Sequence, residues 1–471
     1  MTPGHGTTAA ATLSLYLFTL NCALTPINRT SLSQQLFSGL EPSTTSLPDV
    51  LVLSLQELAP LAHSLIGGSF LVPYFARFHD AVEEAARKFG GHEQGGAEEI
   101  YTAVAARNIG MTGIMVFARD PAAIRDLETG SLGVGIWATG NKGAVGVRFT
   151  YENGAGSTEL TFIAAHLAAM EWEVARRNED WKSIVRGLVF SSEAKAKATS
   201  LSNSQSEARP LLSVSPRDAS VYKPTSHLFV AGDLNYRTSS IKPGPEDHKD
   251  TFPQPHDPEE HANHWTKLFE DDQLNAERRA GRTMHGLVEA PVTFPPTYKY
   301  SSKQAPMKMD VEPSTWHWAT HRWPSWCDRI LYLPVPGWLA SEHPEARIQV
   351  RKYSALPLME TSDHRAVAMD VTLPLLPIPA PPPAGSGTEA YTAAGAGADA
   401  DAEMETTDPR IEPPFDLDPD WKSKREKARM LELLLGFTFY FTTTWEGAGV
   451  LAASIAGIVG SVFVLKAMLD F

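Results

Sequence analysis

Cysteine is nearly absent from this chain, since only Cys22 and Cys327 occur among its 471 residues. Two cysteines cannot form a disulfide framework, which favours a reducing compartment. An excess of positive charge is also lacking: 41 Lys and Arg face 55 Asp and Glu, and the formal net charge is −14. This balance argues against a general nucleic-acid-binding protein.

The usual marks of a signal peptide are missing as well. An apolar run covers residues 13–24, but no Lys or Arg precedes it, and Thr19, Asn21 and Cys22 interrupt it. These features favour a first β-strand over residues 13–20, ending at Asn21, rather than a signal peptide.

What the chain does have is apolar residues, at 43% of the total. That is enough for one large core or for two folded units. The negative charge is concentrated in residues 374–420, where ten Asp or Glu stand against one Arg. The preceding part is far closer to neutral and can hold a local basic pocket.

Short apolar runs alternate with helical patterns through residues 12–373. We expect further strands at residues 49–55, 114–118, 145–149, 160–165, 229–232, 324–333 and 366–373, and helices at 61–88, 171–190 and 261–280. Residues 191–221 lack apolar periodicity and are expected to be a surface insertion. This alternation predicts an α/β fold with mixed sheets.

Polar residues follow these apolar runs where the strands end. The clearest case is residues 232–237, Gly-Asp-Leu-Asn-Tyr-Arg, in which Gly232 is expected to permit a tight turn. Asp233 and Asn235 lie two residues apart, so in an extended chain they face the same side. An isolated Asp-x-Asn more often only caps a turn. Similar ends carry Asn21, Glu57, His166, Asp328, Asp363 and His364. Carboxylates can bind a hard cation, a base can activate water, and a histidine can neutralise charge on phosphoryl oxygens. Such a set of residues suits metal-assisted phosphoester hydrolysis.

The C-terminal region has a different composition. Residues 374–420 are rich in Pro, Ala and Gly and then acidic, and are expected to be a disordered linker. A basic cluster within residues 422–429 follows, and residues 447–465 are 19 uncharged residues. As a helix they would extend about 28 Å, close to the thickness of a bilayer core. One span is the simplest interpretation, and the apolar residues before Glu446 leave a re-entrant hairpin open.

Several short motifs closely resemble those of the inositol polyphosphate 5-phosphatases, a branch of the endonuclease/exonuclease/phosphatase superfamily. The most specific are GDLNYR at 232–237, PSWCDRIL at 324–331, SDHR at 362–365 and PPTYKY at 295–300. LQEL at 55–58, NKGAVGVRF at 141–149 and HLAA at 166–169 support them. The resemblance covers about residues 12–373 and implies a two-sheet α/β sandwich that removes the inositol 5-phosphate with Mg²⁺, with the catalytic domain expected over residues 1–373.

The resemblance also implies roles for individual residues. Glu57 and Asn21 would bind Mg²⁺, Asp233 would activate water, and Asn235 would hold the nucleophile. His364 would contact the scissile phosphate, oriented by Asp328. The remaining candidates are His166 as a second phosphate ligand, Asp363 beside the metal site, and Lys142, Tyr298, Lys299, Arg237 and Arg365 in substrate binding. Ala165, Met170 and Ala144 depart from the common family pattern, which bears on the choice among ring phosphates.

The expected substrate is phosphatidylinositol 4,5-bisphosphate. Soluble inositol polyphosphates are the alternative, and a superfamily nuclease or a silent lipid-binding protein is disfavoured by the motifs and the intact site residues. The expected partners are the lipid substrate and a membrane, with no nucleic acid, and the expected state is a monomer. The linker 374–420 and the segment 421–471 would anchor a cytosol-facing enzyme by its C-terminal helix, with the endoplasmic reticulum as the expected membrane.

Overall fold

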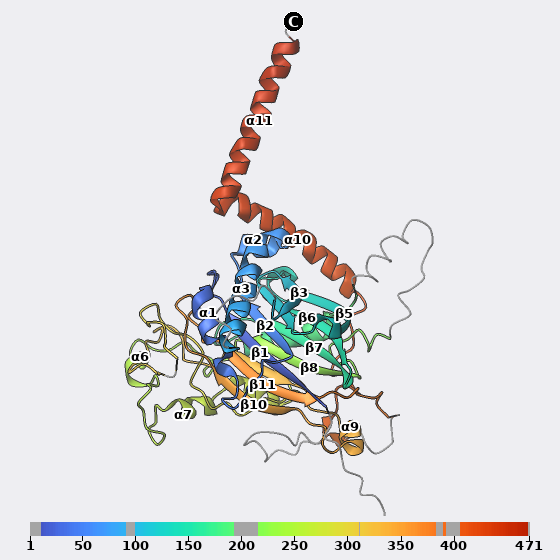
Figure 1. Cartoon of the computed structure of the whole chain (residues 1–471). Helices are drawn as coiled ribbons and strands as arrows, with labels where there is room; N and C mark the ends of the chain where they lie inside the picture. Colours follow the sequence, from blue (N-terminus) through green and yellow to red (C-terminus); the bar gives the residue numbers. More distant parts are fainter. Residues whose placement is uncertain are drawn as a thin grey trace, which may run out of the picture.

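The structure is a computed structural model that describes residues 11–90, 99–192, 215–309, 311–382, 390–391 and 406–469. Two large sheets form its centre, with strand orders β10-β11-β1-β2-β4-β3 and β5-β6-β7-β8-β9 (Figure 1). The strands are β1 Thr12–Asn21, β2 Val50–Gln56, β3 Thr102–Ile109, β4 Thr112–Ala118, β5 Ile124–Gly133, β6 Gly143–Asn153, β7 Gly156–His166, β8 Ser226–Asp233, β9 Asp328–Tyr332, β10 Gln349–Ala355 and β11 Val367–Pro374. A short pair, β12 Ala390–Tyr391 and β13 Thr406–Thr407, lies outside these sheets.

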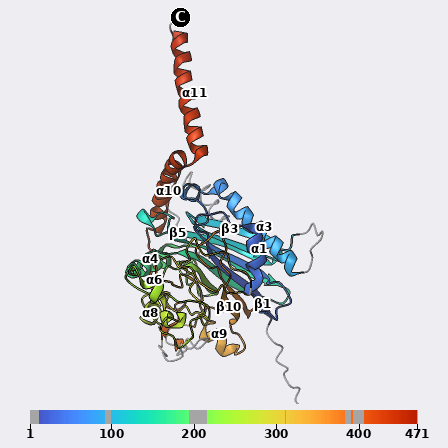
Figure 2. The same ribbon diagram turned by 90° about the vertical axis from the view of Figure 1, so that its left-hand side faces the viewer.

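The helices surround the two sheets, apart from the last, which extends away from them (Figure 1). They are α1 Arg29–Gln35, α2 Leu61–Ile66, α3 Val72–Phe89, α4 Val174–Gly187, α6 Asp247–Asp250, α7 Trp265–Glu270, α8 Gln273–Arg279, α9 Gly337–Glu342, α10 Trp421–Thr443 and α11 Trp445–Leu469. Single 3₁₀ turns are η1 Leu36–Gly39, η2 Gly68–Phe70, η3 Pro121–Ala123 and η4 Ile136–Ala138. Figure 2 shows α1 and α3 on one side of the sandwich, and α4 and α8 on the other.

The alternation of side chains along β1 explains how the layers pack. Leu15 and Leu17 belong to the core between the two sheets, whereas Tyr16 and Phe18 belong to the core under α1 and α3. Successive residues of a strand point to opposite faces, so an apolar strand supplies both cores. The predicted two-sheet α/β sandwich is confirmed.

Two parallel strand pairs define the edge of the sandwich at which the candidate site lies. β1 pairs in parallel with β2, and β7 pairs in parallel with β8, while the other pairs are antiparallel. The two sheets meet at this edge, where Ser54 Oγ of β2 donates to the Ala231 carbonyl of β8 at 2.9 Å. The carboxyl ends of all four strands therefore lie together.

Several expected elements differ from the observed ones. The helix expected at 61–88 is divided into α2 and α3, because Gly67 and Gly68 adopt left-handed φ values of 71° and 60°. The helix expected at 261–280 is divided into α7 and α8, and Asp272 caps the second. Strands β3, β5 and β10 were not predicted, since their half-buried sequences lack a long apolar run.

We expected residues 374–420 to be a disordered linker, but the ends of this segment that the structure describes make ordered contacts with the domain. Ile378 is buried beside Trp338, and Arg410 is fully buried and donates to the Pro334 carbonyl. The Asp418 amide donates to the Arg186 carbonyl at 2.8 Å. A few large side chains thus fix the ends of this segment, although the segment as a whole contains few large apolar residues. Most of the predicted insertion at 191–221 lies outside the described residues.

The C-terminal region forms two helices in series. α10 packs against α2, and Thr444 separates it from α11, which extends away from the domain (Figure 1). Among the described residues, α11 is the one helix long and apolar enough to cross a membrane by length and composition. It contains the 19-residue span expected at 447–465.

Candidate active site

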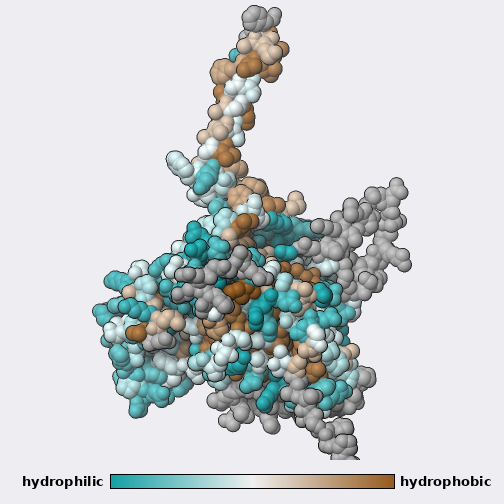
Figure 3. Space-filling model, in the orientation of Figure 1, coloured by the Kyte–Doolittle hydropathy of each residue, from teal (hydrophilic) through white to brown (hydrophobic). Residues whose placement is uncertain are grey.

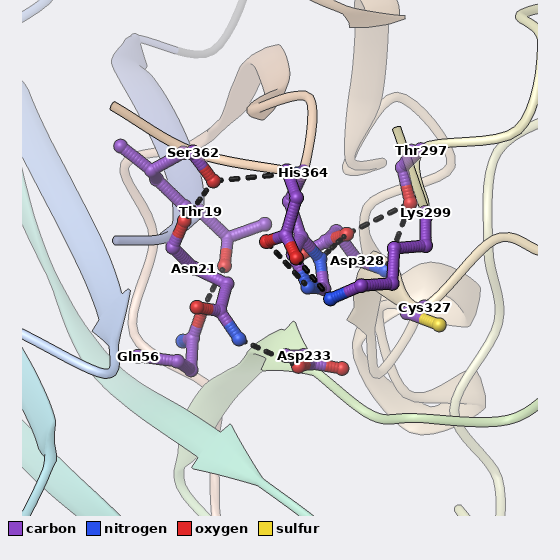
Figure 4. Close-up of polar contacts among 12 residues, drawn as sticks. Thr19, Asn21, Gln56, Asp233, Thr297, Lys299, Cys327, Asp328, Ser362 and His364 are labelled. Carbon is purple, nitrogen blue, oxygen red and sulfur yellow. Dashed lines mark hydrogen bonds and ion pairs between the residues drawn. The ribbon is translucent and has the colours of Figure 1, made fainter. Parts of the chain in front are cut away.

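Asp233, the last residue of β8, is the centre of the site (Figure 4). Its Oδ2 accepts a hydrogen bond from Asn21 Nδ2 at 2.9 Å, and its Oδ1 accepts from the Asn235 amide at 3.1 Å. Gly232 brings β8 close to β7, because a Cβ there would lie 1.9 Å from the Ala165 carbonyl oxygen. Its role is thus this close approach rather than the tight turn that we expected.

His166 ends β7 opposite Asp233. Its Nε2 lies 3.4 Å from Asp233 Oδ2 and also makes a hydrogen bond with Lys142 Nζ. Burial lowers the pKa of His166, and the charge of Lys142 lowers it further. Burial likewise lowers the pKa of Lys142, opposed by the charges of Asp233 and Glu57. The ends of β7 and β8 therefore bring an imidazole to a carboxylate, and Lys142, just before β6, adds a cation beside the imidazole.

His364 and Asp328 form a second buried pair. His364 Nδ1 lies 2.9 Å from Asp328 Oδ2, and Thr297 Oγ1 donates to the same oxygen at 2.8 Å. Ser362 Oγ accepts from the His364 amide at 3.0 Å and donates to the Asn21 carbonyl at 2.6 Å. These contacts hold the imidazole between β1 and β9.

Electrostatics fix the charge states of His364 and Asp233. Burial alone would lower the pKa of His364, but Asp328, Asp233 and Asp363 raise it to about 9. Burial alone would raise the pKa of Asp233, but the hydrogen bond from His166, with His364 and Lys142, holds it well below its usual range. At neutral pH an imidazolium therefore faces an ionised carboxylate.

Glu57 and Asn21 offer oxygen ligands for a divalent cation. Glu57 follows β2 in a left-handed conformation with φ of 48°, which is strained for a residue with a side chain. Among the described residues, no hydrogen bond or ion pair engages its carboxylate, and no group of three His, Cys, Asp or Glu forms a closed metal cage. An open carboxylate beside a carboxamide fits a hard cation that keeps positions for substrate oxygens and water.

Three of the expected substrate-binding residues border this centre. Lys299 forms an ion pair with Asp363, and both side chains are about one quarter exposed. The Tyr298 ring lies 4.5 Å from the His364 ring, between centroids. Together with Lys142 they provide two cations and a phenol, which can bind phosphate groups away from the reacting one.

The other predicted residues have different surroundings. Asn235 uses its carboxamide internally, since Nδ2 donates to the Leu167 carbonyl at 3.1 Å and Oδ1 accepts from Arg237. Arg237 is buried beneath Tyr298, with its guanidinium 4.3 Å from the ring centroid. Arg365 does not join the cluster, because its guanidinium donates to the Leu356 carbonyl at 3.0 Å and to Glu312 at 2.6 Å. Of the two arginines expected to bind substrate, one therefore supports the site from below and one lies outside it.

The residues that support the site were not predicted from the sequence. Thr297 and Ser362 occur in the PPTYKY and SDHR motifs, but nothing in their spacing indicated that they hold Asp328 and His364. Gln273 was also missed, and its Oε1 accepts hydrogen bonds from the Arg237 amide at 2.9 Å and from Arg177 at 2.7 Å. Hydroxyl and amide side chains are too common for a pattern to single them out.

Several known proteins are similar in sequence to this chain. Inositol-1,4,5-trisphosphate 5-phosphatase 1 of Schizosaccharomyces pombe is 27% identical over 354 residues, which are 72% of this chain and 26% of that protein. Type II inositol polyphosphate 5-phosphatase 14 of Arabidopsis thaliana is 32% identical over 44% of this chain and 17% of its own length. Rat synaptojanin-1 is 31% identical over 49% of this chain and 12% of its own length. The chain thus spans about a quarter or less of these relatives.

A solved structure supports the fold. The inositol polyphosphate 5-phosphatase domain of a synaptojanin, crystallised with inositol (1,4)-bisphosphate and a calcium ion, superposes with a TM-score of 0.50 at 24% identity. The match covers 77% of this chain and 84% of that one. The sequence profile of endonuclease/exonuclease/phosphatase family 2 matches residues 18–370. The resemblance found in the sequence is therefore confirmed, and the chain belongs to the endonuclease/exonuclease/phosphatase family 2.

Proposed function

We propose that this chain is a Mg²⁺-dependent phosphoinositide 5-phosphatase that converts phosphatidylinositol 4,5-bisphosphate to phosphatidylinositol 4-phosphate. The observation that carries the proposal is the convergence of Asp233, His166 and the Asp328–His364 pair at one edge, with Lys142 and Lys299 beside them. Buried carboxylates and imidazoles next to two lysine side chains suit the removal of one phosphate from a molecule that carries several.

Each part of the reaction has a candidate residue. Asp233 stays ionised and accepts a proton from the attacking water, while protonated His364 donates a hydrogen bond to a phosphoryl oxygen. Glu57 and Asn21 would hold Mg²⁺, which when bound would neutralise charge on the phosphoryl group. Lys142, Tyr298 and Lys299 would bind the remaining ring phosphates by exchanging their present contacts for phosphate oxygens.

The proposed setting is the cytosolic face of a membrane, most simply the endoplasmic reticulum, with the chain as a monomer. α11 provides a candidate anchor, and basic residues lie on the N-terminal side of it, which agrees with the positive-inside rule. A catalytic domain facing the cytosol would reach lipids of the membrane that holds it. Protease treatment of intact microsomes should digest this domain, and its protection would contradict the topology.

Phosphate release is the direct test of the activity. Purified full-length protein should release phosphate from vesicles containing phosphatidylinositol 4,5-bisphosphate when Mg²⁺ is present, and EDTA should abolish release. Soluble inositol 1,4,5-trisphosphate and supercoiled DNA serve as alternative substrates, and Asp233→Asn serves as the inactive control. Faster hydrolysis of the soluble substrate would favour the inositol polyphosphate alternative, and nicking of DNA alone would overturn the proposal.

A further inference from the structure

One face of α10 is fixed to the catalytic domain. Arg429 donates two hydrogen bonds of 2.7 Å to the Leu65 and Ile66 carbonyls at the C-terminal end of α2. Gly436 allows close contact there, because a Cβ would lie 2.9 Å from a side-chain carbon of Ile66 and 3.0 Å from its amide nitrogen. The Tyr440 ring lies 5.2 Å from the Phe70 ring. Hydrogen bonds, close packing and an aromatic contact thus span most of the helix.

A second face of α10, about a third of a turn from the docked one, is apolar and uncovered. Met430, Leu434 and Phe437 are 74%, 65% and 41% exposed, and Phe437 stacks on Phe441. Their spacings of four, three and four residues place them in one stripe along the helix. The buried Glu432, which pairs with Arg425 and Arg429, lies on the other side. The stripe is therefore a distinct surface rather than part of the domain contact.

This stripe leads directly into the candidate membrane span. Thr444 alone separates α10 from α11, whose first residue, Trp445, is 91% exposed. In Figures 1 and 2, α10 crosses the top of the domain at a large angle to α11. Figure 3 shows hydrophobic side chains along α11, above the point where it leaves the domain. The exposed Lys422, Lys424 and Lys427 lie at the start of α10 and complement anionic head groups.

The docking partner of α10 is close to the active-site edge. α2 begins four residues after Glu57, at the carboxyl end of β2. α10 also contacts η4, in the loop that leads to Lys142. A surface that bound α10 would therefore also keep the active-site edge of the domain close to that surface.

We propose that α10 is an interfacial helix, with its apolar stripe embedded in the surface of the membrane that α11 crosses. This inference rests on the proposed membrane anchoring. α10 then seats the catalytic domain on the lipid surface in one orientation, so the active-site edge stays beside the membrane. An amphipathic helix with a basic start and aromatic residues on its apolar face has the features of such an element.

Site-specific fluorescence tests the inference. Both native cysteines are buried, so a single introduced cysteine can be labelled with an environment-sensitive fluorophore. Leu434→Cys and Phe437→Cys report on the stripe. Glu342→Cys in α9, at the opposite end of the domain, is the matched control (Figure 1). Each full-length variant is reconstituted into vesicles of phosphatidylcholine and phosphatidylserine.

The labels at 434 and 437 should emit at shorter wavelength than the label at 342, and lipids with brominated acyl chains should quench them. Identical emission at all three sites, in protein that resists alkaline carbonate, would overturn the inference and leave the anchor intact. Protein released by carbonate would instead contradict the anchor itself.

A functional readout separates orientation from catalysis. The double variant Leu434→Asp/Phe437→Asp keeps α11 and every site residue. It should hydrolyse vesicle lipid several-fold more slowly than the unchanged chain, yet hydrolyse a short-chain soluble lipid at the same rate. Equal rates on vesicles would show that the stripe does not orient the domain.

Discussion

His364 is surrounded by negative charge. Asp328 lies 2.9 Å from its Nδ1, Asp363 lies 3.8 Å from its Nε2, and Asp233 acts on it from β8. Protonation relieves the repulsion among these carboxylates, so it stabilises the folded site. That contribution is fully present below pH 6.5 and is lost as the pH rises through about 9.

The Asp328→Asn variant should move the pH profile of activity. Asp328 is the strongest of the groups that raise the pKa of His364, so its loss should shift the alkaline limb of kcat toward lower pH. Thr297→Val is the control, because it removes a hydrogen bond to Asp328 but no charge. An unchanged alkaline limb in Asp328→Asn would show that another group controls it.

Glu57 supplies the carboxylate that is expected to bind Mg²⁺. Glu57→Gln keeps the size of the side chain and removes its charge, so the Mg²⁺ concentration for half-maximal activity should rise by at least about tenfold. Glu360→Gln is the control, since Glu360 is an exposed carboxylate that accepts a hydrogen bond from Asn28. Mg²⁺ titration of both variants gives the comparison, and equal Mg²⁺ requirements would remove Glu57 from the metal site.

The break between α2 and α3 creates the platform for α10. With Gly67 and Gly68 in left-handed conformations, α2 ends at Ile66 and exposes its last carbonyls, which Arg429 then caps. A single continuous helix over 61–88 would satisfy these carbonyls internally. The glycine pair thus gives α2 an end at which a second helix can dock.

Gly436→Leu should separate α10 from α2. The added side chain meets Ile66 at less than van der Waals distance, and overpacking of this kind costs about 1–3 kcal/mol. Amide exchange in α2 should therefore accelerate. Gly449→Leu is the matched control, because no atom lies within 4 Å of a Cβ at that position in α11. Equal exchange in the two variants would contradict the docking.

The tail of the molecule is partly integrated with the catalytic domain. Ile378 and Arg410 are buried, and α10 packs on α2, so parts of the chain after β11 contribute to the folded domain. A truncation chosen from composition alone, after Leu373, would remove all of these contacts.

Two truncations should therefore behave differently. A chain ending at Thr443 loses α11 alone and should remain in the supernatant after ultracentrifugation, with hydrolysis of short-chain lipid unchanged. A chain ending at Leu373 should melt at a lower temperature, because loss of a buried aliphatic side chain alone costs about 2–5 kcal/mol. Calorimetry compares the two, and equal melting temperatures would show that the tail contacts add no stability.

The amino-acid sequence by itself determined the α/β class, the principal strands and the chemistry of their ends. It could do so because a buried strand needs a continuous apolar run, and a polar residue after such a run has few structural explanations. Asp233 and His166 follow such runs, Asp328 and His364 lie at the ends of others, and the family motifs gave Lys142 its expected role.

The tertiary structure decided what depends on distant residues. The pairing of Asp328 with His364, the pairing of Arg365 with Glu312 and the burial of Arg237 follow from contacts between segments far apart in the chain. The docking of α10 on α2 joins residues more than 360 positions apart. Local patterns carry no information on such pairings, since the free energy that selects them arises only when separate elements pack together.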